Sequence, residues 1–137
     1  MIDTFWGDPI SVYTRAQALA DGVLVDLTAQ ARPYGFKIPL ACTEAVWLSV
    51  QWTEATEARK PDATGQSTDG RLHDVLSLAR MAAQGAAQAG AAVVEFEALM
   101  VPVDGRATAP RAQLFRLVVS GGDRGEPVLT LMLPGED

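Results

Sequence analysis

The sequence predicts an α+β fold in which a three- to four-stranded, mainly antiparallel sheet packs against about three helices. The apolar residues of 72–86 recur every three or four positions, which is typical of a helix with one buried face. After residue 91 the period changes to two, which is typical of half-buried strands. The 137 residues, of which 48% are hydrophobic, fit a single domain spanning 1–137.

Residues 13–28 have the pattern of a complete helix, turn and strand. The Thr14 hydroxyl is suited to accept from a free N–H in the first turn of a helix that runs to Ala20. Gly22 stands where a left-handed residue would end that helix. The β-branched run 23–27 then predicts a short buried strand.

A second helix is expected to begin at Thr43, with Trp47 on its apolar surface, and to end in a polar stretch before Pro61. The preceding residues 36–41 are expected to be extended, at a sheet edge or at a strand start. Residues 61–70 contain no large apolar side chain and predict a mobile loop between two helices.

The third helix carries the periodic residues 72–86 and is expected to end between Gly85 and Gly90. Three strands then follow, at 92–101, 112–119 and 128–133, and the glycine-rich stretch 121–125 is expected to form the last hairpin loop. These strands predict an antiparallel meander with helices on one face, to which residues 23–27 could add a fourth strand.

Composition narrows the classes of function. The net charge of −6, without a cluster of Lys or Arg, argues against direct nucleic-acid binding. A single cysteine, Cys42, and a single histidine, His73, exclude a cysteine zinc cluster and multi-histidine metal sites, and no cofactor is expected. We see no signal peptide and no apolar run of bilayer length, so a cytoplasmic location is expected.

The candidate interaction residues are two tryptophans and a polar group near the first helix: Trp6, Trp52, Tyr13, Arg15 and Asp21. Arg15 lies in the first turn of its helix, where a positive charge is mildly unfavourable, so it is expected to serve a partner. That partner is either a nearby acid, in a salt bridge, or an anionic ligand bound together with Tyr13 and Asp21. The tryptophans are either core anchors or exposed contact residues.

Several segments resemble a family of small uncharacterised proteins encoded on plasmids, integrative elements and phages of proteobacteria. The matching segments are 11–18 (SVYTRAQA), 21–26 (DGVLVD), 45–47 (AVW), 70–76 (GRLHDVL), 125–130 (GEPVLT) and 133–137 (LPGED). The resemblance carries no catalytic motif. It implies a setting among the accessory genes of mobile elements, where anti-defence proteins are common.

The leading expectation is therefore a protein that binds a host protein, as an inhibitor of the anti-CRISPR or antirestriction type. A small transferase or hydrolase that binds an anionic ligand near Tyr13 and Arg15 is the enzyme alternative. A regulatory or structural homo-oligomer is the third alternative. A deep pocket at Tyr13, Arg15 and Asp21 would favour the enzyme, and an exposed patch at Trp6 or Trp52 would favour binding.

Overall fold

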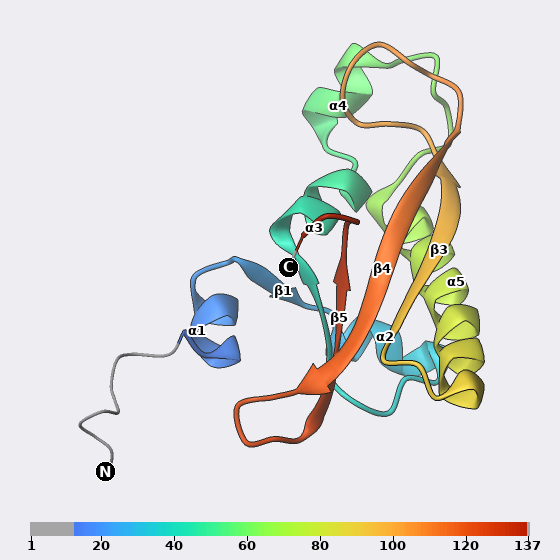
Figure 1. Cartoon of the computed structure of the whole chain (residues 1–137). Helices are drawn as coiled ribbons and strands as arrows, with labels where there is room; N and C mark the ends of the chain where they lie inside the picture. The colour runs from blue at the N-terminus through green and yellow to red at the C-terminus, as the bar shows by residue number, and fades with distance from the viewer. Residues whose placement is uncertain (1–12, 137) are drawn as a thin grey trace.

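The computed structural model describes residues 13–136, which form a five-stranded sheet in the order β1-β2-β5-β4-β3 (Figure 1). Trp6 lies outside the described residues. The strands are β1 (Leu24–Asp26), β2 (Leu40–Thr43), β3 (Val93–Met100), β4 (Arg111–Gly121) and β5 (Pro127–Met132). The helices are α1 (Arg15–Ala20), α2 (Thr28–Ala31), the 3₁₀ helix η1 (Arg32–Tyr34), α3 (Glu44–Val50), α4 (Glu54–Arg59) and α5 (Thr68–Ala89).

The predicted α+β class and the β3–β4–β5 meander are confirmed, and the sheet is larger and more mixed than expected. The run at residues 23–27 does form a strand, β1, but it is an edge strand with partly exposed side chains. The extra strand is β2, which lies between β1 and β5 and pairs parallel to β5. Pro39 stands just before β2, and its carbonyl accepts a bond from the Leu129 N–H, so the proline marks a strand start.

One apolar core, which we call the main core, fills the space between the sheet and the helices α2, α3 and α5. The side chains that alternate toward it from β3 are Val94, Phe96, Ala98 and Met100, as the period of two predicts. The other buried members are contributed by every layer of the fold, including Leu27, Ala31, Phe36, Leu40, Cys42, Val46, Val50, Leu72, Val75, Leu76, Ala79, Phe115, Leu117, Leu129 and Leu131.

The helix and the turn of the first unit form as the sequence predicts. The Thr14 hydroxyl accepts from the Gln17 N–H, and the Gln17 side chain accepts from the Thr14 N–H, which completes a capping box. Gly22 adopts a positive φ of 78° where the chain turns from α1 into β1.

The second predicted helix is two helices, α3 and α4. Gln51 is extended, with φ −65° and ψ 127°, so α3 ends at Val50. Thr53 then caps α4 by accepting from the Thr56 N–H. The break forms because the Trp52 N–H donates to the Thr68 hydroxyl of α5 and not to a helical carbonyl, a long-range bond that no local pattern reveals.

The expected loop 61–70 is shorter than predicted, because α5 begins at Thr68 with Ser67 as its cap. Ala63 is buried, so this segment also contributes to packing. The α5 helix ends at Gly90 in the left-handed conformation, within the predicted interval. Helix α4, segment 60–67 and the β3–β4 loop 101–110 lie together at one end of the molecule (Figure 1), and we call them the α4 lobe.

Candidate functional site

The predicted polar group near α1 separates into two unrelated sets of contacts. Tyr13 is exposed, and its hydroxyl donates to Asp21 Oδ2 over 2.7 Å. This bond raises the pKa of Tyr13, because the ionised phenol would repel the carboxylate. Tyr13 and Asp21 are therefore hydrogen-bonded to each other at the two ends of α1. The Tyr13 hydroxyl proton is already used in this bond.

Arg15 is directed away from that pair and toward the sheet. Its guanidinium donates to the Thr130 hydroxyl and to the Leu129 carbonyl, each over 2.8 Å. Burial lowers the pKa of Arg15, and neighbouring carboxylates, Asp26 first, partly offset that effect. Within residues 13–136 Arg15 forms no ion pair, and its guanidinium attaches α1 to the central strand β5.

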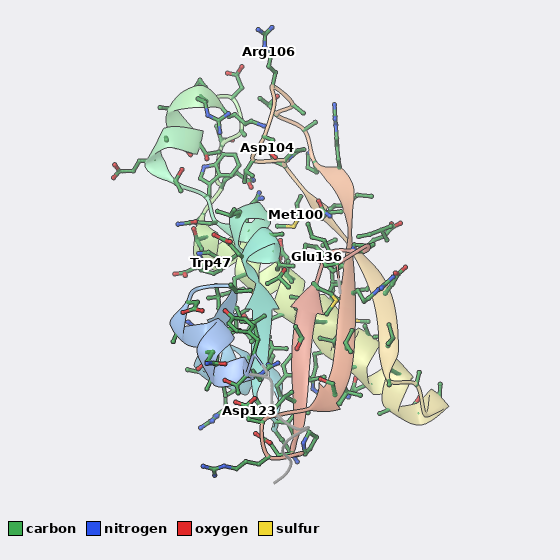
Figure 2. All side chains as sticks on the ribbon, turned by 60° about the vertical axis from the view of Figure 1, so that its left-hand side comes forward. Trp47, Met100, Asp104, Arg106, Asp123 and Glu136 are labelled. Atoms are coloured by element: carbon green, nitrogen blue, oxygen red, sulfur yellow. The ribbon has the colours of Figure 1, made fainter. Side chains whose placement is uncertain are left out.

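Asp123, which the sequence analysis did not single out, completes this attachment. Its two carboxylate oxygens accept from the Arg15 and Ala16 backbone N–H groups at 2.8 and 3.0 Å. These bonds lower the pKa of Asp123, because they favour the charged form. Figure 2 shows Asp123 in the β4–β5 loop beside α1, a position 107 residues away in sequence from Ala16 and therefore without a local signal.

Trp52 is buried, so it forms no exposed patch. Its ring packs with Ala63 and Val101, and its Nε1 donates to Glu57 Oε1 over 2.7 Å. The Arg71 guanidinium lies 5.0 Å from the centre of the ring, within the range of a cation–π contact. Trp52 is thus an internal anchor of the α4 lobe.

Arg71 is a buried cation that ends α3. Its Nε and one Nη donate to the Val50 and Ser49 carbonyls at 2.8 and 2.7 Å, which are carbonyls that a helix end leaves without partners. Its other Nη donates to Gln66 Oε1. Burial lowers the pKa of Arg71. The side chain therefore holds α3, α5 and segment 60–67 in one arrangement.

Lys60 is a second buried cation that sequence reasoning missed, since it lies in the polar stretch expected to end the second helix before Pro61. Its side chain is 1% exposed, and its Nζ donates to three carbonyls, those of Pro102, Asp104 and Ala107. The three ammonium donors match these three acceptors, so Lys60 fixes the course of loop 101–110. Burial lowers the pKa of Lys60.

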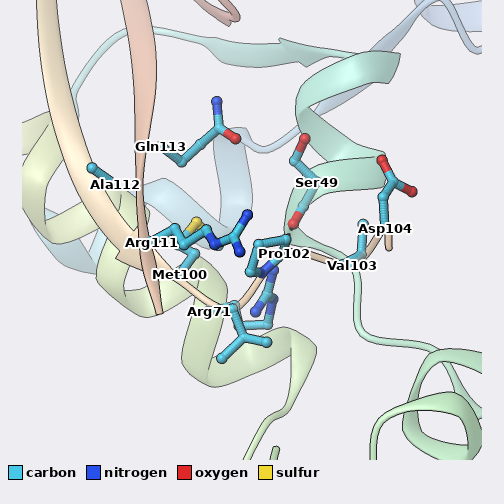
Figure 3. A pocket seen from close by; sticks show the side chains of 10 residues that line it. Ser49, Arg71, Met100, Pro102, Val103, Asp104, Arg111, Ala112 and Gln113 are labelled. Atoms are coloured by element: carbon cyan, nitrogen blue, oxygen red, sulfur yellow. Dashed lines mark hydrogen bonds between the residues drawn. The ribbon is translucent and has the colours of Figure 1, made fainter. Parts of the chain in front are cut away.

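A polar pocket of about 240 Å³ opens between the α4 lobe and the start of β4 (Figure 3). Its chemical groups are the Arg71 and Arg111 guanidinium groups, the Asp104 carboxylate, the Gln113 amide and the Ser49 hydroxyl. The Ser49 hydroxyl already donates to the Ala45 carbonyl. Among residues 13–136, the Arg111 guanidinium has no hydrogen bond or ion pair, so it is the donor that this pocket offers to an anionic group.

The single cysteine and the single histidine, which are candidates for a nucleophile and a base, are otherwise engaged. Burial raises the pKa of the Cys42 thiol to about 12, which leaves no reactive thiolate at neutral pH. The His73 ring Nδ1 is hydrogen-bonded to the Tyr34 hydroxyl over 2.7 Å. Within residues 13–136 no three His, Cys, Asp or Glu side chains are grouped as metal ligands, and no helix has the length and apolar character needed to cross a bilayer.

The outer face of the β3–β4 hairpin, directed away from α5, is a regular exposed surface that the burial patterns of both strands define. Cross-strand pairs on it are Val93 with Val118, Glu95 with Arg116, Glu97 with Leu114, and Leu99 with Ala112. Leu99 is 71% exposed and Leu114 is 42% exposed. Arg116 and Glu95 form an ion pair of 2.9 Å on the same face, and this pair separates the two leucines from Val93. This mixture of apolar and charged groups is typical of a protein-binding surface.

Comparison with family models places the chain in one family. A model described as a family of unknown function, DUF6573, matches residues 2–137. The chain belongs to DUF6573. No curated protein and no solved structure gave a significant match.

The match to DUF6573 covers all five strands, the α4 lobe and the outer face. It therefore confirms the expectation of an uncharacterised family. Since the family description contains no activity, the surface chemistry of residues 13–136 carries the functional argument.

Proposed function

We propose that the protein is an accessory protein of a mobile genetic element that acts by binding a host protein, as an inhibitor of a bacterial defence system of the anti-CRISPR or antirestriction type. The resemblance of segments such as 11–18 and 70–76 to proteins of plasmids, integrative elements and phages supports the setting. The outer face of the β3–β4 hairpin supports the mode of action, because it combines exposed leucines with charged neighbours.

The single observation that carries the proposal is the exposure of Leu99 and Leu114 on that face. Strand side chains that face water are ordinarily polar, and here the two leucines lie on adjacent strands of a regular ladder. Burying both beneath a partner would remove apolar surface from water and favour association. The neighbouring Glu97 and Arg116 would then form the polar part of the contact.

The polar side chains near α1 already hydrogen-bond to other groups of the protein, which favours the protein-binding proposal over the enzyme alternative. An anion placed beside Tyr13 would meet the Asp21 carboxylate, while the Arg15 guanidinium is held on β5. Four pockets are found among residues 13–136. Tyr13, Arg15 and Asp21 do not line any of these four.

The test is a phage plaquing assay in bacteria that carry one active CRISPR or restriction system at a time, with and without the protein. We expect the wild-type protein to raise plaquing in at least one system and the double variant Leu99→Glu/Leu114→Glu to lose that effect. Two charges at the centre of an interface should weaken binding by more than tenfold.

Met81→Glu is the matched control, because Met81 is an equally exposed apolar residue on α5, away from the outer face. All variants must keep the wild-type circular dichroism spectrum and melting temperature. If the wild-type protein leaves plaquing unchanged in every system, the anti-defence proposal fails. If the double variant acts like the wild type, binding does not occur through the outer face.

A further inference from the structure

Strand β3 ends the sheet on the side opposite β1, and it is long, regular and open. Its eight residues pair with β4 in an uninterrupted register from Val93 with Val118 to Met100 with Arg111. The other edge strand, β1, has only three residues. The two edges of the same sheet therefore differ in how much unpaired backbone they present.

One hydrogen bond shows which N–H and C=O groups of β3 point toward β4 and which point away from the sheet. The Val119 N–H donates to the Ala92 carbonyl, so Ala92 and Val119 form a hydrogen-bonded pair at the start of the ladder. In an antiparallel ladder such pairs alternate with pairs whose N–H and C=O groups point away from each other. The outward-pointing backbone groups of β3 are consequently those of Val93, Glu95, Glu97 and Leu99.

These groups have no backbone hydrogen-bond partner within residues 13–136 beyond the β3–β4 ladder, and their side chains are exposed. Strand edges that must stay unpaired usually carry a proline, a bulge or charged side chains, lysine above all. β3 contains no proline, bulge or lysine, and its two charged side chains, Glu95 and Glu97, would repel an acidic strand and attract a basic one. The edge is thus chemically ready to accept another strand.

A second copy of this chain fits the edge poorly. The two antiparallel registers that overlap almost the whole of β3 and match its faces place Glu95 opposite the copy's Glu97, or Glu97 opposite its equivalent. Like charges directly opposite each other destabilise a strand pair. Glu95 is already paired with Arg116, whereas Glu97 faces Leu114 and has no ion pair within the described chain. The edge therefore calls for a positively charged neighbour.

We infer that the free edge of β3 binds an extended segment of a partner protein as a sixth strand, with basic side chains beside Glu95 and Glu97 and apolar side chains beside Leu99. Main-chain hydrogen bonds to the outward groups would supply affinity, and the alternating side chains would supply selectivity. This inference rests on the proposed protein-binding function, and it specifies the chemistry of the partner.

The direct test uses a synthetic peptide that alternates lysine with valine. Hydrogen exchange followed by NMR should show that this peptide slows exchange at the amides of Val93, Glu95, Glu97 and Leu99 in particular. A peptide with the same composition but with its lysines grouped together has the same charge and cannot match the alternation. Binding of both peptides to the same extent, or binding without protection of the four amides, would overturn the inference.

Two variants separate the backbone contribution from the charge contribution. Glu97→Pro removes an outward N–H that takes no part in the β3–β4 ladder, so the fold should tolerate it while the added strand loses a donor. It is compared with Glu97→Gln, which removes the same charge and keeps the N–H, so the difference between the two is the backbone contribution. Glu95→Lys/Glu97→Lys should weaken the peptide about tenfold or more and reverse its salt dependence. Asp62→Lys, an exposed charge reversal in segment 60–67, is the control and should change affinity little.

The plaquing assay then distinguishes the two proposals. If the wild-type protein counteracts defence and the Glu97→Pro variant does so equally, the protein-binding function stands and the edge inference fails. If the peptide protects the four amides but no defence system is affected, the edge is a strand-binding site and the anti-defence proposal fails.

Discussion

In the main core, apolar side chains from the sheet and from α2, α3 and α5 touch one another, whereas in the α4 lobe two buried cations hold the chain through backbone carbonyls. Phe115 represents the first region: it is fully buried and stacks on Phe96 with ring centres 5.5 Å apart. Lys60 and Arg71 represent the second, each with three hydrogen bonds to surrounding groups.

Because of this difference, we expect mutations in the two regions to destabilise the protein in different ways. Packing in the main core is shared by many contacts, so its loss lowers the stability of the whole domain. The lobe depends on a few directional bonds, so losing one donor should open a local segment before the sheet unfolds. The predictions below test this contrast.

The largest expected effect is that of Phe115→Ala in the main core. Removing a fully buried aromatic ring typically costs about 3–5 kcal/mol of unfolding free energy through lost burial and the cavity left behind. Urea denaturation followed by circular dichroism measures this change. A loss below about 1 kcal/mol would mean that the main core is not the unit that sets global stability.

Arg71→Leu should have an intermediate effect, because it removes the guanidinium that binds the carbonyls at the end of α3. Hydrogen bonds that involve a charged group each contribute about 1.5–3 kcal/mol, and leucine replaces part of the lost packing. We therefore expect a loss of about 2–3 kcal/mol in the same denaturation experiment. Arg106→Leu at the tip of loop 101–110 is the control, with a change within about 0.5 kcal/mol (Figure 2).

Lys60→Met should open the α4 lobe and leave the main core closed. Methionine keeps much of the apolar stem but leaves the carbonyls of Pro102, Asp104 and Ala107 without their donor. Limited proteolysis should cut loop 101–110 faster, while Cys42, buried in the main core, stays protected from thiol reagents.

Lys37→Met is the matched control for that experiment, since Lys37 is the other lysine of the chain and is exposed. It should change neither proteolysis nor labelling of Cys42. If Lys60→Met exposes Cys42 as quickly as it exposes loop 101–110, the lobe and the main core unfold as one unit.

The smallest expected effect is that of Asp123→Ala, which loosens α1 and depends on pH. The pKa of Asp123 is lower in the folded protein than the value of about 3.9 expected in the unfolded chain. Its contribution is therefore fully present above about pH 4 and is lost as the pH falls through the folded pKa. Amide exchange at Arg15 and Ala16 should be faster in the variant at pH 7, and the two proteins should converge in acid. A difference that persists after the Asp123 carboxylate has been protonated would assign the effect to loop packing.

The same contrast explains how much of the structure the sequence could predict. The helix of residues 72–86, the alternation of β3 and the Thr14 cap depend on neighbours close in sequence, and all three are confirmed. The break at Gln51 and the burial of Lys60 depend on partners 16 to 47 residues away, which leave no periodic pattern. Lysine is usually solvated at a helix end, so local preference favoured the wrong prediction.

The candidate sites follow the same rule. Tyr13 and Asp21 lie close in sequence and do meet, whereas the partners of Arg15 on β5 lie 114 and 115 residues away. Trp52 could not be assigned to the interior until the loop Val101 and the helix residue Arg71 were placed against it. The outer face, by contrast, follows from the alternation of 92–101 and 112–119, which places Leu99 and Leu114 on the side opposite the buried residues.

The parallel pairing of β2 with β5 has a consequence for how the chain is made in the cell. β5 occupies residues 127–132, next to the end of the chain, yet it lies in the middle of the sheet, between β2 and β4. During synthesis β1 and β2 leave the ribosome long before their neighbour exists, so they must wait with their apolar surface exposed. The sheet can close only after residues 127–132 have been synthesised, because β5 is the strand that joins β1 and β2 to β3 and β4.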